Sequence, residues 1–201
     1  MIRSAVAAPP LRRAAGPLAL FLFLCVPSLV AAELSIGAQA PDLTLTALDG
    51  APCSLRSLQQ APVTVLIFLS AECPVSNEYV GRMNALARDY TGRVTVLGVN
   101  SNRNESADQV RQHAADYRLS FPVYKDPNNV LADLFGITVT PQAVVLDGRQ
   151  KLRYRGRIDD SQKIVRVTRS DLRLTLDAML AGRPVEVPET KAFGCTIKRA
   201  Q

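Results

Sequence analysis

The stretch VTVLIFL, from Val63 to Leu69, is the feature that most limits what this chain can fold into. It is free of charge and rich in β-branched residues, so it predicts a strand buried on both faces, as in a sheet covered by helices. From Ser76 onward the apolar residues instead recur at helical spacing, which predicts a helix with one face on the sheet. These helical positions are Tyr79, Val80, Met83, Leu86, Ala87 and Tyr90.

The alternation of strand and helix continues toward the C-terminus. Asp-Gly pairs at 49–50 and 147–148 are typical of hairpin turns. Strands are expected near 94–99, at 121–124 and on both sides of the second hairpin turn, and helices at about 107–117, 130–134 and 171–180. This order predicts an α/β fold, a central mixed β-sheet with helices on both faces.

The N-terminal segment has the layout of a secretory signal. Basic residues precede an apolar run from Leu18 to Ala32 that ends in small residues, so we expect residues 1–32 to be a signal peptide cleaved after Ala32. The run is shorter than the ~20 residues of a spanning helix, and an uncleaved membrane anchor is the alternative. Cys25, inside the run, lacks the small residues that would precede a lipid-anchored cysteine. Residues 33–201 then form one domain, with a cysteine-containing tail from about residue 183.

Charge gives little indication of a partner. The net charge of +6 falls to +3 once residues 1–32, which hold three arginines and no acid, are removed. The remaining excess is spread along the chain, so nucleic-acid binding is not expected. The charges of YRGRIDD, at 154–160, could line the edge of a site, but solvated surface charge is the commoner reading. The triplet at 104–106 has the form of a glycosylation sequon.

Three cysteines remain after residue 32, namely Cys53, Cys73 and Cys195. The odd number leaves at least one thiol outside any internal pairing. Cys73 stands where the buried strand gives way to the helix, and Pro74 suits a first helical turn. Open amide groups there favour a thiolate, the reactive form of cysteine, and the Ser76 hydroxyl could point back toward the sulfur. A buried cysteine that only fills an apolar gap is the alternative.

Three segments carry a resemblance to a known family: FLSAECPVSN at the strand–helix junction, FPVYKD, and TPQAVVLD. With them the chain resembles the thioredoxin-like superfamily, in particular its redoxin branch, the alkyl hydroperoxide reductase and thiol-specific antioxidant group. The resemblance implies a thioredoxin-like fold and a cis Thr140–Pro141 bond that faces Cys73 and shapes a groove for an extended thiol substrate. It implies no cofactor.

Departures from the family pattern bear on the activity. Peroxiredoxins carry Pro-x-x-x-Thr/Ser-x-x-Cys and a site arginine. Ser70 holds the Thr/Ser place here, but Leu66 replaces the proline and the arginine position falls on Pro141. Without that cation, peroxide reduction loses electrostatic help, so it becomes the alternative activity.

Other members of the superfamily use a second cysteine close to the first. The thioredoxin place for it holds Ser76 here, and the copper-chaperone place holds Asn77. His113 lies within a predicted helix, where we read it as a surface or packing residue, so no metal site is expected.

Cys73 can form a mixed disulfide with a substrate, but release then needs another thiol, and Cys195 is the better internal candidate for it. Cys195 lies in an irregular-looking tail after Gly194, with Lys198 and Arg199 following. Some exported redoxin-like proteins share such a Gly-Cys-x-Ile ending. A Cys73–Cys195 exchange is favoured slightly over a structural Cys53–Cys195 bridge.

The sequence thus predicts an exported thiol–disulfide oxidoreductase. Its substrates would be protein disulfides or thiols, or small peroxides in the alternative activity, and its electron donor an unidentified thiol reductant. A non-catalytic module that binds a partner segment beside Pro141 is the rival from another class.

Overall fold

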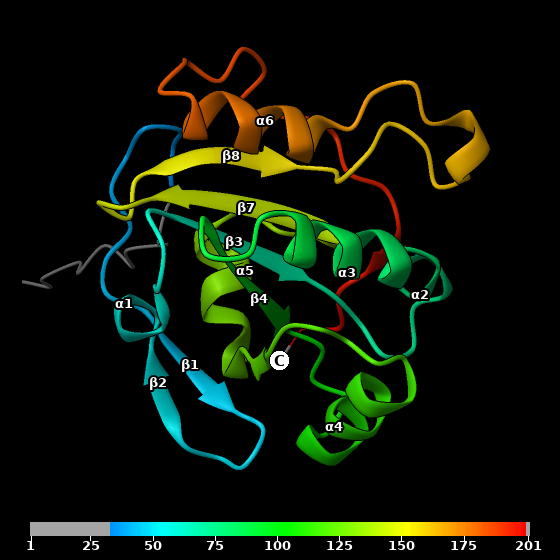
Figure 1. Cartoon of the computed structure of the whole chain (residues 1–201). Helices are drawn as coiled ribbons and strands as arrows, with labels where there is room; N and C mark the ends of the chain where they lie inside the picture. The colour runs from blue at the N-terminus through cyan, green and yellow to red at the C-terminus, as the bar shows by residue number, and fades with distance from the viewer. Residues whose placement is uncertain (1–32, 200–201) are drawn as a thin grey trace, which may run out of the picture. The chain divides into compact units, whose positions relative to one another are not determined.

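The computed structural model describes residues 33–199, so the expectations for residues 1–32, including Cys25, lie outside the described part. A seven-stranded mixed sheet forms its centre, in the order β2-β1-β5-β4-β3-β7-β8 (Figure 1). Its strands are β1 (Thr44–Ala47), β2 (Pro52–Ser54), β3 (Val63–Phe68), β4 (Val94–Asn100), β5 (Val123–Lys125), β7 (Gln142–Asp147) and β8 (Leu152–Gly156). A separate two-stranded ladder joins β6 (Val139–Thr140) to β9 (Cys195–Thr196).

Six α-helices and two 3₁₀ turns complete the described fold, counted over residues 33–199. They are α1 (Leu55–Leu58), α2 (Pro74–Glu78), α3 (Val80–Asp89), α4 (Ala107–Asp116), α5 (Val130–Leu134), α6 (Asp171–Leu180), η1 (Pro127–Asn129) and η2 (Ile164–Arg166). The predicted helix after Cys73 is therefore two helices, α2 and α3, that meet at Tyr79.

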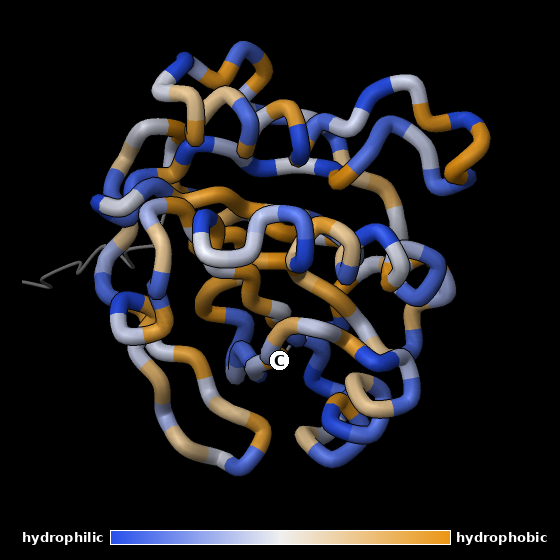
Figure 2. The backbone as a smooth tube through the Cα atoms, viewed as in Figure 1, coloured by the Kyte–Doolittle hydropathy of each residue, from blue (hydrophilic) through white to orange (hydrophobic). Residues whose placement is uncertain are grey.

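Strand β3 is the central element, as its apolar sequence predicts. It pairs in parallel with β4 and antiparallel with β7, and all six of its residues are buried. Because strand side chains alternate between faces, Val65 and Ile67 enter one hydrophobic cluster while Leu66 and Phe68 enter the other. Figure 2 shows the apolar residues concentrated along these inner strands.

Helices cover both faces of the sheet, which confirms the predicted fold class. Residues of α3 and α6, with Val110 of α4, pack on the cluster that contains Val65. Residues of α1 and α5 pack on the opposite cluster together with Ile197 from the chain's last residues. The two hydrophobic clusters therefore hold β3 in place from both faces, and with it the start of the loop that leads to Cys73.

The tail is more ordered than its composition suggests. It was expected to be irregular, yet Cys195 and Thr196 form β9 and pair with Thr140 and Val139 of β6. Ile197 is buried at 4% exposure and donates its N–H to the Thr138 carbonyl at 3.0 Å. Contacts with distant residues hold the tail, and these leave no periodic pattern in the sequence.

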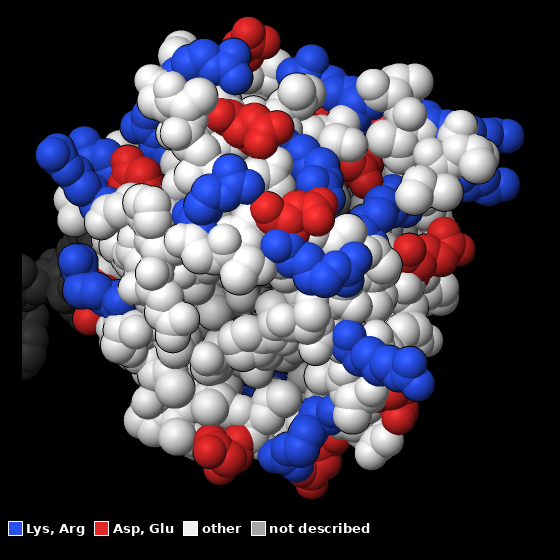
Figure 3. Space-filling view, in the orientation of Figure 1, with Lys and Arg blue, Asp and Glu red and all other residues white. Residues whose placement is uncertain are grey.

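Two surface properties matter for partners. Figure 3 shows basic and acidic side chains interspersed over the face it presents, in line with the scattered positive excess of the sequence. Among residues 33–199, none of the helices has the length and apolar character needed to cross a membrane.

Candidate active site

Cys73 lies directly ahead of helix α2, at the end of the loop that follows β3. It is the N-cap of the helix, and Pro74 occupies the first helical turn, where a missing N–H costs no intrahelical bond. The backbone N–H of Ser76 points at the Cys73 sulfur at 3.3 Å. A hydrogen bond of this kind stabilises negative charge on sulfur and so favours the thiolate.

Ser76 contributes differently from the expectation. Its hydroxyl was expected to point back toward the sulfur, but the oxygen accepts the Ser70 N–H at 3.3 Å. The donor toward Cys73 is the main-chain N–H of Ser76, which the sharp start of α2 turns toward the preceding sulfur. The Ser76 side chain therefore holds the loop at Ser70, and the Ser76 main-chain N–H faces the Cys73 sulfur.

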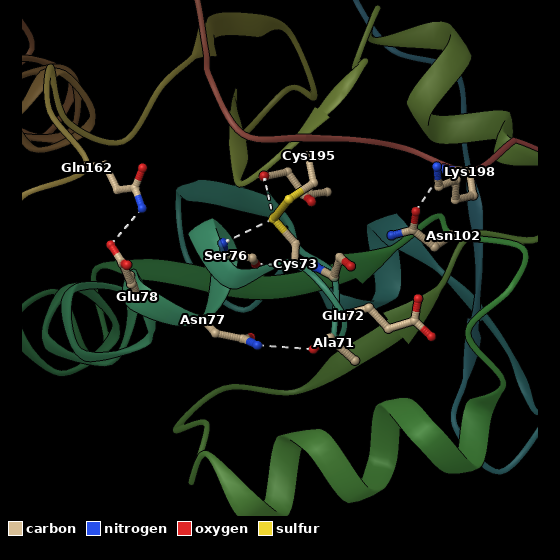
Figure 4. The surroundings of a disulfide bond; sticks show 12 residues. Ala71, Glu72, Cys73, Ser76, Asn77, Glu78, Asn102, Gln162, Cys195 and Lys198 are labelled. Carbon is tan, nitrogen blue, oxygen red and sulfur yellow. Dashed lines mark hydrogen bonds between the residues drawn. A yellow bond between two sulfur atoms is a disulfide. The ribbon is translucent and has the colours of Figure 1, made fainter.

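The second sulfur comes from the tail. Cys73 and Cys195 form a disulfide with their α-carbons 5.8 Å apart, while Cys53 on β2 is a free thiol (Figure 4). The rival Cys53–Cys195 bridge is therefore absent from the described structure. A separation of 122 residues lies between the two bonded cysteines. The short ladder between β6 and β9 brings them together, because Cys195 pairs with Thr140.

The Thr140–Pro141 turn forms the wall opposite the helix start. Its peptide bond is cis, and the Thr140 carbonyl oxygen lies 3.3 Å from the Cys73 sulfur. Gly194 passes so close that a β-carbon there would lie 1.9 Å from the Thr140 oxygen. Its φ of +151° is also one that other residues rarely adopt. Only glycine allows the tail to approach this turn closely enough for Cys195 to reach Cys73.

A second anchor holds the tail before it reaches the site. Thr190 donates its N–H to the Arg155 carbonyl at 3.1 Å, and its hydroxyl lies 2.6 Å from the Tyr154 hydroxyl. Burial raises the pKa of Tyr154, so the phenol stays protonated, and it donates to the Arg157 carbonyl at 2.6 Å. Downstream of this anchor, Phe193 packs against Tyr79 with ring centroids 6.4 Å apart.

A buried carboxylate that the sequence reading missed supports the loop before Cys73. Glu105, 2% exposed, accepts a hydrogen bond from the Ser70 hydroxyl and another from the Ala71 N–H at 2.8 Å. The Asn100 side-chain amide also donates to it. These bonds fix residues 70–72 and hence the position of the sulfur that follows. The only sequence signal was an acid within the polar segment SNRNES, which reads as a solvated loop.

Lys125 holds this acid's own loop in place. Its ammonium group donates to the carbonyls of Asn102 at 2.8 Å and of Glu105 at 2.6 Å. Burial lowers the pKa of Lys125, and the carboxylates of Glu105 and Asp126 oppose that shift.

His113 packs beneath the site. Its Nε2 lies 2.8 Å from the Asn77 side-chain oxygen, and the Asn77 amide donates to the Ala71 carbonyl at 3.1 Å. Burial lowers the pKa of His113, which favours the neutral ring. His113 thus braces the loop before Cys73 through Asn77, which agrees with the packing role expected from the sequence.

The charged segment at 154–160 is bound within the protein. Arg157 pairs with Asp171 at 2.6 Å, and Asp159 pairs with Arg82 at 2.9 Å, with both acids nearly buried. These pairs tie the chain after β8 to helices α6 and α3, and they replace the solvated charges expected from the sequence.

A cleft of about 120 Å³ opens at the disulfide. Cys73, at 1% exposure, forms its inner wall, whereas Cys195 is partly exposed. Figure 4 shows the Glu72 side chain extending away from the disulfide, where it accepts a hydrogen bond from Asn104 at 2.8 Å. The remaining lining comes from Ser70, Asn102, Glu105, Thr196 and Lys198.

The chain is similar to several known proteins. The AhpC/TSA family matches residues 36–155, a range that contains Cys73 and Pro141 but ends before the tail. "Thioredoxin-like protein YneN" of Bacillus subtilis (strain 168) is 31% identical over 112 residues, which are 55% of this chain and 65% of that protein. The chain thus spans less than two thirds of that relative's length.

Two solved structures are similar over most of the chain. The hypothetical protein SMc02350 from Sinorhizobium meliloti 1021 has a TM-score of 0.75 and 28% identity, and the match covers 84% of this chain and 96% of that one. An uncharacterized conserved protein from Geobacillus kaustophilus has a TM-score of 0.74 and 31% identity, with 83% and 93% covered. In both, the similarity reaches beyond the range of the family match.

Proposed function

This chain belongs to the AhpC/TSA family and has a thioredoxin-like fold, and from that premise we propose that it is an exported thiol–disulfide oxidoreductase. Cys73 is the nucleophile and Cys195 the resolving thiol. Pro74 and Ser76 shape the helix start beside the sulfur, and Thr140 with Pro141 shapes the opposite wall. The observation that carries the proposal is the Cys73–Cys195 disulfide held against the cis-proline turn.

The reaction begins from the reduced protein. The Cys73 thiolate attacks one sulfur of a substrate disulfide, forms a mixed disulfide and releases the other substrate sulfur as a thiolate that takes up a proton. Cys195, as thiolate, then attacks the Cys73 sulfur and releases the second substrate sulfur. The substrate disulfide is reduced to two thiols, and the protein is left with the Cys73–Cys195 bond. An external thiol reductant resets it.

The test compares three serine variants in the reduction of a protein disulfide, with insulin as substrate and dithiothreitol as donor. Cys73→Ser should abolish catalysis, and Cys195→Ser should accumulate the mixed disulfide on Cys73. Cys53→Ser is the matched control, because the free thiol on β2 belongs to neither step. Unchanged activity in Cys73→Ser would remove the proposal.

Peroxide reduction is the weaker activity for this site. The Ser70 hydroxyl, which holds the peroxiredoxin Thr/Ser place, donates its hydrogen bond to Glu105. Its proton is therefore already engaged, and the hydroxyl cannot at the same time donate to a peroxide oxygen. A stopped-flow rate with hydrogen peroxide no faster than that of free cysteine is the expected result.

Export belongs to the proposal and rests on the sequence of residues 1–32. The intact mass of the protein from its native host should correspond to a chain that begins at residue 33, recovered from the periplasmic or extracellular fraction. Recovery of residues 1–32 in the membrane fraction would instead support the anchored alternative.

A further inference from the structure

The two sulfurs of the disulfide differ in accessibility. Cys73 is 1% exposed because the tail strand β9 and the Thr140–Pro141 turn lie over it. Cys195 is partly exposed, and its neighbours in sequence, Gly194 and Thr196, are exposed. A thiol that arrives from solvent therefore meets Cys195 first.

The direction from which a thiolate attacks determines which of the two sulfurs can react. In thiol–disulfide exchange the entering sulfur, the attacked sulfur and the leaving sulfur lie in one line, and access decides which sulfur reacts. Attack on Cys73 would need an approach from the side opposite Cys195, where the Ser76 N–H and the packed start of α2 lie. Attack on Cys195 needs an approach from the cleft and the solvent.

The leaving group points to the same route. Among residues 33–199, the N–H that donates to the disulfide is that of Ser76, 3.3 Å from the Cys73 sulfur, and the Thr140 carbonyl oxygen lies 3.3 Å from the same sulfur. A better stabilised thiolate leaves faster. Cys73 is therefore the better leaving sulfur, and Cys195 is the sulfur that can be reached.

We infer that the reductant of the oxidised protein attacks Cys195, so that its mixed disulfide forms on the tail and not on the family's active-site cysteine. The reductant thiolate bonds to the Cys195 sulfur, and the bond between the two cysteines breaks with its electron pair on Cys73. A second thiol of the reductant then attacks the reductant sulfur bound to Cys195 and frees the Cys195 thiolate. The protein gains two electrons, and the reductant leaves as a disulfide.

This inference rests on the proposed function and adds that the two cysteines react with different partners. Substrate reacts at Cys73 in the reduced protein, and the electron donor reacts at Cys195 in the oxidised one. The reductant class is a thiol that approaches the partly exposed Cys195 sulfur in the cleft. Donor and substrate are then recognised by different surfaces.

The test uses the oxidised wild-type protein with reduced glutathione as the probe thiol. The reaction is stopped at short times with acid, free thiols are blocked with N-ethylmaleimide, and tryptic peptides are weighed. Trypsin separates the cysteines, with Cys73 on peptide 57–82 and Cys195 on peptide 192–198. The same measurement on Cys53→Ser removes exchange with the third thiol.

The expected result is glutathione on peptide 192–198 and N-ethylmaleimide on peptide 57–82. We expect an excess of about tenfold or more over the reverse pattern, since tenfold corresponds to only about 1.4 kcal/mol between the two routes. Equal labelling, or glutathione mainly on Cys73, would overturn the inference. Its failure is distinct from that of the proposed function, which is judged by insulin reduction in Cys73→Ser.

Discussion

The disulfide should dominate the stability of the oxidised protein. It closes a loop of 122 residues, for which the loss of chain entropy in the unfolded state corresponds to about 5 kcal/mol at 25 °C. This is an upper value, because reduction also frees part of the folded state. The folded tail is still held at Thr190 but gains conformational freedom beyond it, which offsets part of the loss. We therefore expect reduction to lower the free energy of unfolding by about 2–5 kcal/mol.

Urea denaturation, followed by far-UV circular dichroism with and without tris(2-carboxyethyl)phosphine, measures this change. With a slope of about 2 kcal/mol/M, a loss of 3 kcal/mol moves the unfolding midpoint by about 1.5 M. Cys195→Ser should unfold near the midpoint of the reduced wild type and should not respond to the reductant. Cys53→Ser should respond as the wild type does, because its thiol is unpaired.

Two results would contradict a stabilising role of the Cys73–Cys195 bond. If the wild-type midpoint is the same with and without reductant, while mass spectrometry confirms that the bond has opened, the loop closed by Cys73 and Cys195 carries no stabilisation. A reductant-sensitive Cys195→Ser would show that another pairing is responsible.

Three further predictions concern the groups around the disulfide. Gly194→Val should lower the equilibrium constant for disulfide formation by about tenfold or more, because a side chain there meets the Thr140 carbonyl. A cost of about 1.4 kcal/mol is enough for a tenfold change. Thiol titration in glutathione buffers measures this constant. Glu105→Gln should cost about 1–3 kcal/mol of unfolding free energy in urea, because an amide N–H₂ then faces donors such as the Ala71 N–H. Burial lowers the pKa of His113 in the folded state, so the stability that comes from the neutral ring is present above pH ~6.5 and is lost as the pH falls. When the urea unfolding midpoint is measured against pH, His113→Gln should flatten the curve in that range.

Two of these predictions have a matched control variant. Gly81→Ala, at a glycine with open space around it, should leave disulfide formation unchanged. Glu186→Gln, at an exposed acid, should leave the midpoint unchanged. A Gly194→Val variant that oxidises like the wild type, a Glu105→Gln variant of unchanged stability, or a His113→Gln variant that keeps the full pH response would contradict the role expected of that residue.

The sheet and its helices were predictable because their burial is periodic in the sequence. The uncharged run of β3 and the spacing of Val80, Met83 and Leu86 encode which faces are buried. The cis bond before Pro141 followed from the family resemblance, since X–Pro bonds are cis in only about 5–6% of cases in folded proteins.

The parts that were not predictable depend on single long-range contacts. Glu105 accepts hydrogen bonds from Ser70 and Ala71, which lie more than thirty residues away, and its neighbours in sequence are polar, so its segment reads as a surface loop. The two residues of β9 are too few for a strand pattern. The hydrogen bond to Cys73 comes from a main-chain N–H of Ser76, which any residue but proline could supply.

The anchor at Thr190 limits how far the tail can travel once its sulfur is freed. Five peptide steps separate Thr190 from Cys195, and a fully extended chain covers about 17 Å over that length. A short tether of this kind gives the released thiol a local concentration in the millimolar range or above. Reclosure of the Cys73–Cys195 bond is then a first-order event whose rate is independent of protein concentration.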